Sequence, residues 1–285
     1  MSFRVFICGL LFFFTCNLLA EPQLAADASL YYGPNLKVSR TTDIKDDLHT
    51  ILNGYHISQS NAFDSIVKFC SVDQNENCYV HRGFSYKEAR KFLFGFLHLE
   101  TNKAQNYFVK TLYCQEIITN DNLPSGSPLG PMLIPEANIV NTEHSWPQSR
   151  FTNNFSKGLQ KSDLHALYPV RMKVNSTRGN YPFGIVTRIT NKTCKQAALG
   201  KDSNGKTVFE PSDVAKGNVA RSLFYFSTRY KIKIDPDQEK YLREWHRLDP
   251  VDQDEIQRNQ EIFEIQYVRN PYIDRPDWVD QVENF

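Results

Sequence analysis

The sequence has no excess of charge of either sign, because its 285 residues include 33 basic and 32 acidic side chains. This balance excludes any argument from net charge for a nucleic acid, membrane or acidic partner. Beyond about residue 20 the sequence also lacks an apolar run of the ~20 residues that a membrane span needs. It has no internal repeat, no low-complexity tract and no clear domain boundary. The sequence therefore predicts a single α+β domain without stable membrane association.

The N-terminus differs in character from the rest of the chain. A single charge, Arg4, precedes an apolar run from Val5 to Phe14. This pattern predicts a secretory signal peptide over residues 1–20, since the run is too short for a transmembrane anchor. We therefore expect a secreted or periplasmic protein whose single domain covers residues 21–285.

Cysteine is scarce, and its number is informative. Two of the six cysteines lie in the predicted signal peptide, and the other four are Cys70, Cys78, Cys114 and Cys194. An even number in an oxidising compartment predicts two disulfides, with three possible pairings. We favour Cys70 with Cys78 and Cys114 with Cys194. A four-thiolate zinc site would need close cysteine pairs, which this spacing does not supply.

Charge is unevenly distributed along the chain. The segment from Glu143 to Lys206 contains 11 basic and three acidic residues, whereas 14 acidic and six basic residues follow from Asp235 onward. Such asymmetry favours a basic face that attracts a polyanion and an acidic face that stays solvated. Taken alone, it is equally compatible with two ordinary charged surfaces.

Apolar periodicity predicts helices separated by irregular segments. The expected helices cover about residues 43–56, 85–99, 211–231, 238–247 and 250–266. Ser85 can cap the second of them, and Asp249 followed by Pro250 fits the start of the last. Residues 120–135 contain four prolines and two glycines and read as a loop. The predicted fold class is α+β and mainly helical.

The most informative residues are Glu143 and His144, followed by the segment 163–178. We expect a strand over residues 138–144, a second strand over 164–167 and a short helix that Pro169 opens and Gly179 closes. Arg171, Asn175 and Arg178 would lie on one face of this helix, at positions i, i+4 and i+7. Two β elements and a helix would then surround one small site.

These residue types suit metal-assisted cleavage of a phosphodiester. The imidazole of His144 can accept a proton from water at neutral pH. The carboxylate of Glu143 and the amide oxygen of Asn175 can bind Mg²⁺, with Mn²⁺ or Ca²⁺ as alternatives. Arg178 or Arg171 can offset charge on the phosphate. His165 could either orient a ligand or pack between strand and helix.

Strand geometry leaves an alternative open for Glu143. Adjacent residues of a regular strand face opposite sides, so Glu143 and His144 can share a site only at a strand end, bend or bulge. Glu143 could instead be a salt-bridging carboxylate, and His144 could be a buried structural histidine.

Three segments resemble the bacterial endonuclease I family, whose members are periplasmic or secreted nucleases with a ββα-metal (His-Me) finger. These segments are Asn141–Ser149 (NTEHSWPQS), Ser162–Pro169 (SDLHALYP) and Val174–Gly184 (VNSTRGNYPFG). The resemblance covers about Tyr86 to Asp277. It implies cleavage of DNA, and often of RNA, with little sequence preference.

The same resemblance implies roles for individual residues. His144 would be the general base, and Glu143 and Asn175 would bind Mg²⁺. Some relatives carry an arginine and an acidic residue between the first two segments that have no clear equivalent here. The phosphate-binding role therefore stays open between Arg178, Arg171 and Arg150. We expect a monomer that acts on nucleic acid.

Two other classes of protein deserve comparison. A secreted nucleic-acid-binding protein could keep the basic face without chemistry, but binding alone needs neither His144 nor Asn175. A cysteine hydrolase could use Cys194, but four cysteines in an exported chain are better explained by disulfides.

Overall fold

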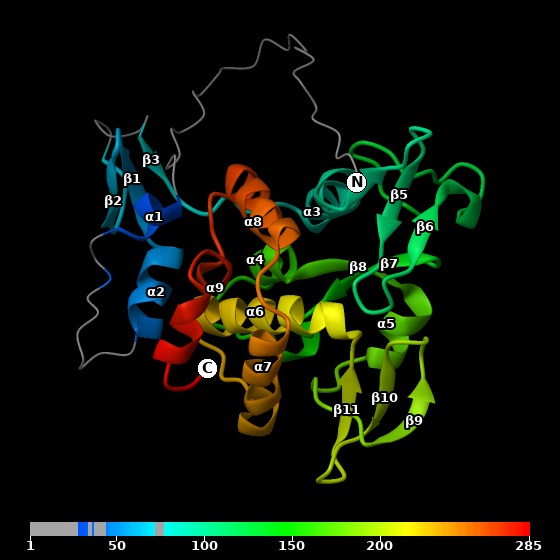
Figure 1. Ribbon diagram of the computed structural model, residues 1–285. Helices are drawn as coiled ribbons and strands as arrows, with labels where there is room; N and C mark the ends of the chain where they lie inside the picture. Colours follow the sequence, from blue (N-terminus) through cyan, green and yellow to red (C-terminus); the bar gives the residue numbers. More distant parts are fainter. Residues whose placement is uncertain (1–27, 34–35, 37–43, 72–76) are drawn as a thin grey trace.

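The computed structural model describes residues 28–33, 36, 44–71 and 77–285, so the predicted signal peptide lies outside the described residues. Four small antiparallel sheets lie around a set of packed helices (Figure 1). The expected mixture of helices and strands is confirmed. The sheets are more extensive than the sequence predicted.

The helices and strands follow one another in mixed order along the chain. The α-helices are α1 Ala28–Tyr32, α2 Ile44–Asn53, α3 Tyr86–Phe92, α4 Lys157–Lys161, α5 Met172–Arg178, α6 Asp213–Tyr230, α7 Pro236–Leu248, α8 Gln253–Gln266 and α9 Pro271–Asp274. The strands are β1 Tyr55–Gln59, β2 Ala62–Val67, β3 Cys78–Tyr79, β4 Leu99–Thr101, β5 Tyr107–Lys110, β6 Ile117–Thr119, β7 Val140–His144, β8 Leu167–Arg171, β9 Arg188–Lys192, β10 Ala198–Lys201 and β11 Thr207–Glu210. Their sheet orders are β2-β1-β3, β4-β5-β6, β7-β8 and β11-β10-β9.

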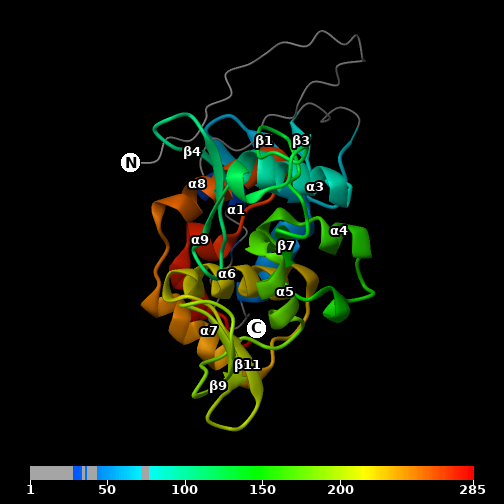
Figure 2. The same cartoon turned by 90° about the vertical axis from the view of Figure 1, so that its right-hand side faces the viewer.

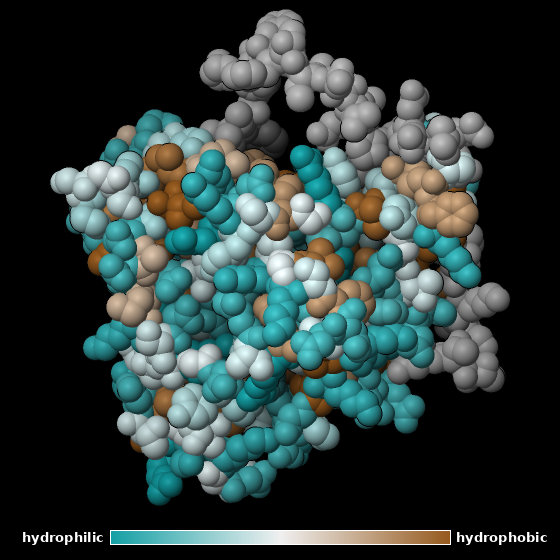
Figure 3. Space-filling view, turned by 180° about the vertical axis from the view of Figure 1, so that it is seen from behind, coloured by the Kyte–Doolittle hydropathy of each residue, from teal (hydrophilic) through white to brown (hydrophobic). Residues whose placement is uncertain are grey.

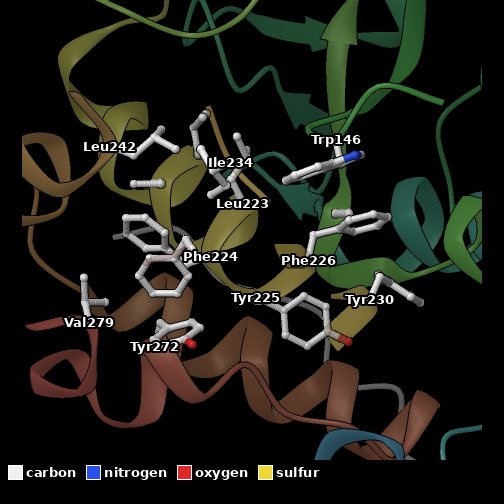
Figure 4. Packing of buried hydrophobic residues seen from close by; sticks show 14 of the residues in the cluster. Trp146, Leu223, Phe224, Tyr225, Phe226, Tyr230, Ile234, Leu242, Tyr272 and Val279 are labelled. Atoms are coloured by element: carbon white, nitrogen blue, oxygen red, sulfur yellow. The ribbon is translucent and has the colours of Figure 1, made fainter. Parts of the chain in front are cut away.

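Helix α6 runs through the middle of the molecule and organises the main core (Figure 1). Fourteen of its 18 residues are buried, which is the pattern of a helix covered on all sides. Phe224 stacks on Phe285 with ring centroids 4.1 Å apart, and Phe226 stacks on Trp146 at 5.3 Å (Figure 4). The C-terminal segment and the segment after β7 therefore pack against the same helix.

Helix α6 also carries polar groups into the core, and each of the charged ones is paired. Arg221 donates to Glu255 of α8, and Arg229 lies 3.7 Å from the carboxylate of Asp163. Gly217 allows a close approach, since a Cβ there would lie 2.0 Å from the carbonyl oxygen of Asp249. The start of α6 and the end of α7 are thus fixed against each other.

Local capping signals predict one of two helix starts correctly. The hydroxyl of Ser85 accepts from the backbone N–H of Glu88, and the Glu88 carboxylate accepts from Ser85, so the cap of α3 is confirmed. The helix predicted to start at Pro250 instead starts after Asp252, whose carboxylate accepts from the N–H of Glu255. Asp249 ends α7. Two acidic residues three positions apart both suit a helix start, and the nearer one to α8 is used.

Of the two strands β7 and β8, the second lies further along the sequence than predicted. Strand β7 confirms the strand expected near residues 138–144, but residues 164–166 form a turn of 3₁₀ helix, and β8 follows at 167–171. Pro169 is therefore a strand residue opposite Thr142, and it does not open a helix. Its carbonyl accepts from the N–H of Leu112, so this prediction was wrong because a long-range strand contact outweighs the helical preference of the local sequence.

Both predicted disulfides are present. Cys70 bonds to Cys78 across a separation of eight residues, and Cys114 bonds to Cys194 across 80 residues. The second bond joins the loop between β5 and β6 to the segment after β9. It therefore ties two sheets that are distant in the sequence.

The face seen from behind is mainly hydrophilic, and apolar side chains appear on it in separate small patches (Figure 3). Within the described ranges, no helix has the length and apolarity to span a lipid bilayer.

Loop length predicts a clear difference between the two disulfides. In the chain-entropy model, replacing Cys114 and Cys194 with serine should lower the free energy of unfolding by about 4–5 kcal/mol, against about 2–3 kcal/mol for Cys70 and Cys78. Guanidinium unfolding of the two double variants would measure both losses. Equal losses would show that loop entropy is not the source of the stabilisation.

Candidate active site

Strand β7, the turn that follows it and helix α5 line a pocket of about 270 Å³. Figure 2 shows α5 beside the end of β7 on one side of the molecule. The lining residues are Tyr86, Asn141, Thr142, Glu143, His144, Pro147, Gln148, Ser149, Asn175, Arg178, Gly179 and Asn180. Four of the predicted site residues, Glu143, His144, Asn175 and Arg178, therefore lie at one pocket.

Glu143 is buried, and one of its oxygens is held from two sides. The hydroxyl of Tyr113 donates to Oε1 at 2.7 Å, and Nη1 of Arg178 lies 3.0 Å from the same atom. Burial raises the pKa of Glu143, whereas Arg178 and Tyr113 act in the opposite direction. With Oε1 engaged, Oε2 is the oxygen through which Glu143 can serve the pocket.

Arg178 at the end of α5 joins the helix to the end of β7. Its guanidinium donates to the carbonyl oxygens of His144 at 3.3 Å, Ser145 at 2.8 Å and Gly179 at 3.2 Å. Its side chain is only 2% exposed, and it lies 4.5 Å from the ring centroid of Phe183. The guanidinium is thus committed to the protein, although Arg178 borders the pocket.

His144 is the last residue of β7, and its hydrogen bonds define a tautomer. Nε2 lies 3.0 Å from the carbonyl oxygen of Lys161, which can only accept, so Nε2 carries the hydrogen. In the neutral ring Nδ1 is then the basic nitrogen, and the amide of Gln148 donates to it at 3.3 Å. Burial lowers the pKa of His144 to about 4, which keeps the ring neutral at physiological pH.

Asn175 reaches the pocket from the middle of α5. Its amide nitrogen donates to the carbonyl oxygen of Thr142 at 3.1 Å. This bond fixes the orientation of the amide and leaves the oxygen Oδ1 available. Because this bond links α5 to β7, both the helix and the strand fix the position of the Asn175 side chain.

The structure places the other three predicted residues outside this pocket. Arg171 precedes α5 as its N-cap and makes two bonds to Glu116, of 2.9 and 2.7 Å, so it does not share a helical face with Asn175. Arg150 donates to the carbonyl oxygen of Asn180 at 2.8 Å. His165 is fully buried, and its Nε2 lies 3.0 Å from the carbonyl oxygen of Val268.

Several residues that contact Glu143 or His144 could not be predicted from the sequence. Tyr113, whose hydroxyl holds Glu143, lies 30 residues upstream and carries no local signal. The ring of Tyr86 lies 5.5 Å from that of His144, and Nζ of Lys161 lies 4.5 Å from the Tyr86 ring. Gln148 is part of the segment that resembles the endonuclease family, and its distance of four residues from His144 suits a turn contact.

The pocket offers two oxygen donors suited to a hard cation. Oε2 of Glu143 is anionic and Oδ1 of Asn175 is neutral, and both atoms belong to side chains whose other polar atom is engaged. Within residues 28–33, 36, 44–71 and 77–285, no group of three or more His, Cys, Asp and Glu side chains is placed to hold a metal. A cation here would therefore depend on water and substrate oxygens for most of its ligands.

Comparison with known proteins identifies the family. A family model described as Endonuclease I matches residues 130–277, which is just over half of the chain. The chain belongs to the Endonuclease I family. The match begins before β7 and includes β8, α5 and α6, so every lining residue of the pocket except Tyr86 lies inside the matched part.

Relatives within this family carry several names. The chain is 38% identical to an extracellular ribonuclease of Bacillus subtilis (strain 168) over 160 residues, which are 50% of this chain and 53% of that protein. It is 32% identical to an Endonuclease-1 of Buchnera aphidicola subsp. Baizongia pistaciae over 48% of this chain and 62% of that protein.

A third relative is named as a deoxyribonuclease. The chain is 30% identical to an extracellular deoxyribonuclease of Aeromonas hydrophila over 40% of this chain and 50% of that protein. The chain thus spans about half the length of the relatives it matches. The ribonuclease and the deoxyribonuclease are named as extracellular, which agrees with the two disulfides of this Endonuclease I family member.

The buried contact between Arg178 and Glu143 should show strong energetic coupling. Arg178→Met leaves a buried carboxylate without its cation and should cost about 3–5 kcal/mol of unfolding free energy. Glu143→Gln in the same protein should recover part of this loss, with a coupling energy of about 1–3 kcal/mol. Guanidinium unfolding of the two single variants and the double variant would measure it.

The exposed pair Arg275–Asp277, with a 2.8 Å contact and both side chains about half exposed, is a matched control. Its coupling should stay below about 1 kcal/mol. Additive losses for Arg178 and Glu143 would contradict the assignment of this pair as the link between α5 and β7.

Proposed function

We propose that this protein is a secreted, Mg²⁺-dependent endonuclease that hydrolyses phosphodiester bonds of DNA and RNA with little sequence preference. The observation that carries the proposal is the convergence of His144, Glu143 and Asn175 on one pocket within the family match. In this proposal β7, β8 and α5 are the ββα-metal finger.

His144 is the general base in this mechanism. The Lys161 carbonyl holds the proton on Nε2, so Nδ1 can take a proton from a water molecule that attacks phosphorus. The amide of Gln148 donates to the same nitrogen and must turn away when water occupies that place. A neutral ring is required for this step, and burial of His144 favours that form.

Glu143 and Asn175 would hold the cation. When bound, Mg²⁺ supplies positive charge that offsets the charge gathering on the phosphate oxygens. Tyr113 and Arg178 hold the carboxylate of Glu143, and the carbonyl of Thr142 holds the amide of Asn175, so both donors are fixed before the substrate arrives. Mn²⁺ or Ca²⁺ would suit the same oxygen donors.

Positive charge around the pocket would bind the substrate backbone. Arg178 is engaged by carbonyl oxygens, so in this proposal it positions β7 and borders the phosphate. The exposed Arg150 contacts the backbone of the nucleic-acid strand. Arg171, paired with Glu116, would contribute at longer range, and His165 supports the fold under β8. Contacts of this kind address phosphates and carry no base information.

The proposal extends to the whole chain. Residues 21–285 would form one nuclease domain, since the main core contains residues from α1, α6 and the C-terminal segment alike. The substrate range follows from relatives named ribonuclease and deoxyribonuclease. We expect the protein to act as a monomer.

Replacing His144 with alanine should abolish most cleavage while nucleic-acid binding stays. General-base catalysis is typically worth about 10²- to 10⁴-fold in rate, and the basic residues around the pocket are unchanged. A plasmid-nicking assay with and without EDTA would measure the loss. His49→Ala, on α2 and outside the pocket, is the matched control and should cut normally.

Near-normal nicking by the His144→Ala protein would remove this residue from the mechanism. Cleavage that is indifferent to EDTA would instead remove the metal from it.

Replacing Asn175 with alanine should raise the Mg²⁺ concentration needed for half-maximal cleavage by roughly tenfold or more, because a site with two protein donors loses one of them. Ser176→Ala, the neighbouring exposed residue on α5, should leave the titration unchanged. Titrations of cleavage against Mg²⁺ would compare the two proteins. An unchanged midpoint for Asn175→Ala would place the cation elsewhere.

A further inference from the structure

A second pocket, of about 590 Å³, lies directly beside the candidate active site. The two pockets share Pro147 and Arg178 as lining residues. Between them stands a wall made of residues 147–150 and 178–181. Ser149 and Asn180 line the candidate active site, whereas Arg150 and Tyr181 line the second pocket. A chain that crosses this wall would enter both pockets.

Hydrogen bonds make the wall a fixed structure. Arg150 donates to the carbonyl oxygen of Asn180 at 2.8 Å, and the amide of Asn180 lies 3.4 Å from the hydroxyl of Ser149. The indole N–H of Trp146 donates to the carbonyl oxygen of Arg150 at 3.1 Å. The spacing between the two pockets is therefore set before any ligand binds.

The second pocket has an apolar floor with an aromatic rim. Trp146, Leu223 and Ile234 line it together, and Figure 4 shows them along one edge of the packed cluster. The Trp146 ring lies nearly parallel to that of Phe226, at 13°, which holds it in place. Tyr181 at the rim is 41% exposed. Such a pocket suits a flat, aromatic group.

Charge at this pocket favours an anion bound to that flat group. Four basic side chains line it, from Lys45, Arg150, Arg178 and Lys233, and Arg178 is the one paired with Glu143. Its two carboxylates are already engaged, Asp235 by Lys206 at 3.0 Å and Glu239 by Arg243 at 2.7 Å. A planar ring attached to a phosphate chain meets both requirements, and neither a purely apolar ligand nor a free anion does.

We infer that the second pocket receives the base of a nucleotide next to the cleaved phosphate. The inference rests on the proposed function, since it assumes that the scissile phosphate lies in the pocket of His144. A base seated in this pocket against the exposed ring of Tyr181 is not paired in a duplex at that moment. The enzyme therefore acts on single strands, or on duplex positions where a base can leave the stack.

Abasic nucleotides test this directly. A single-stranded oligonucleotide with one abasic position would be digested, and the cleavage rate at each bond would be read from a sequencing gel. We expect the bond next to the abasic position on one side to be cut about tenfold more slowly than the same bond in the intact strand, as expected for loss of one stacked base. Uniform cutting along the strand would overturn the base pocket and leave the proposed function intact.

Variants at the rim provide the matched comparison. Tyr181→Ala should lose most of this tenfold difference, and Tyr181→Phe should keep it because the ring remains. Phe63→Ala, an aromatic residue 47% exposed on β2, should behave as the unchanged protein. If Tyr181→Ala kept the full difference, the pocket of Tyr181 would not be the base site.

Binding supplies a readout that needs no cleavage. Fluorescence anisotropy of the His144→Ala protein with a labelled trinucleotide should show about tenfold weaker affinity when one base is absent. Equal affinities would overturn the inference. If the unchanged protein cleaved nothing, but the intact trinucleotide still bound more tightly than the abasic one, the proposed function would be refuted and the base pocket would stand.

Discussion

The arrangement of the candidate active site depends on one buried contact, that of Arg178 with the end of β7. A single guanidinium holds the carboxylate of Glu143 and the carbonyl oxygens of His144 and Ser145. These groups belong to three consecutive residues at the end of β7, where the regular pairing with β8 stops. Two neighbouring side chains can then border the same pocket, although on a flat strand they would face opposite sides. Taking both charged groups out of water costs free energy. Removing one partner costs more, because it leaves the other charge buried and unpaired.

Features set by neighbouring residues could be predicted from the sequence. The Ser85 cap, β7 and the two disulfides all follow from short-range patterns or from cysteine number. Pro169 could not, because its place in β8 depends on pairing with β7 and on the N–H of Leu112. The small sheets could not be predicted for a similar reason. Strands of two to six residues are too short to show a clear alternation of apolar and polar side chains.

The candidate site divides along the same line. Glu143, His144 and Asn175 could be predicted from residue type and resemblance, and the structure brings them to one pocket. The groups that hold them could not be predicted, because the Tyr113 hydroxyl and the Lys161 carbonyl come from distant segments and one of them is a backbone atom. Helical spacing also suggested a shared face for Arg171, but the helix starts one residue too late to include it.

Gly217 shows how far the support of the site extends. The hydroxyl of Ser222, on the same helix α6, contacts both Ser145 and the carbonyl of His165. Any side chain at Gly217 would meet the Asp249 carbonyl and force α6 and α7 apart, and the end of β7 would move with α6. A residue that lines neither pocket thus limits which substitutions the support of both pockets can tolerate.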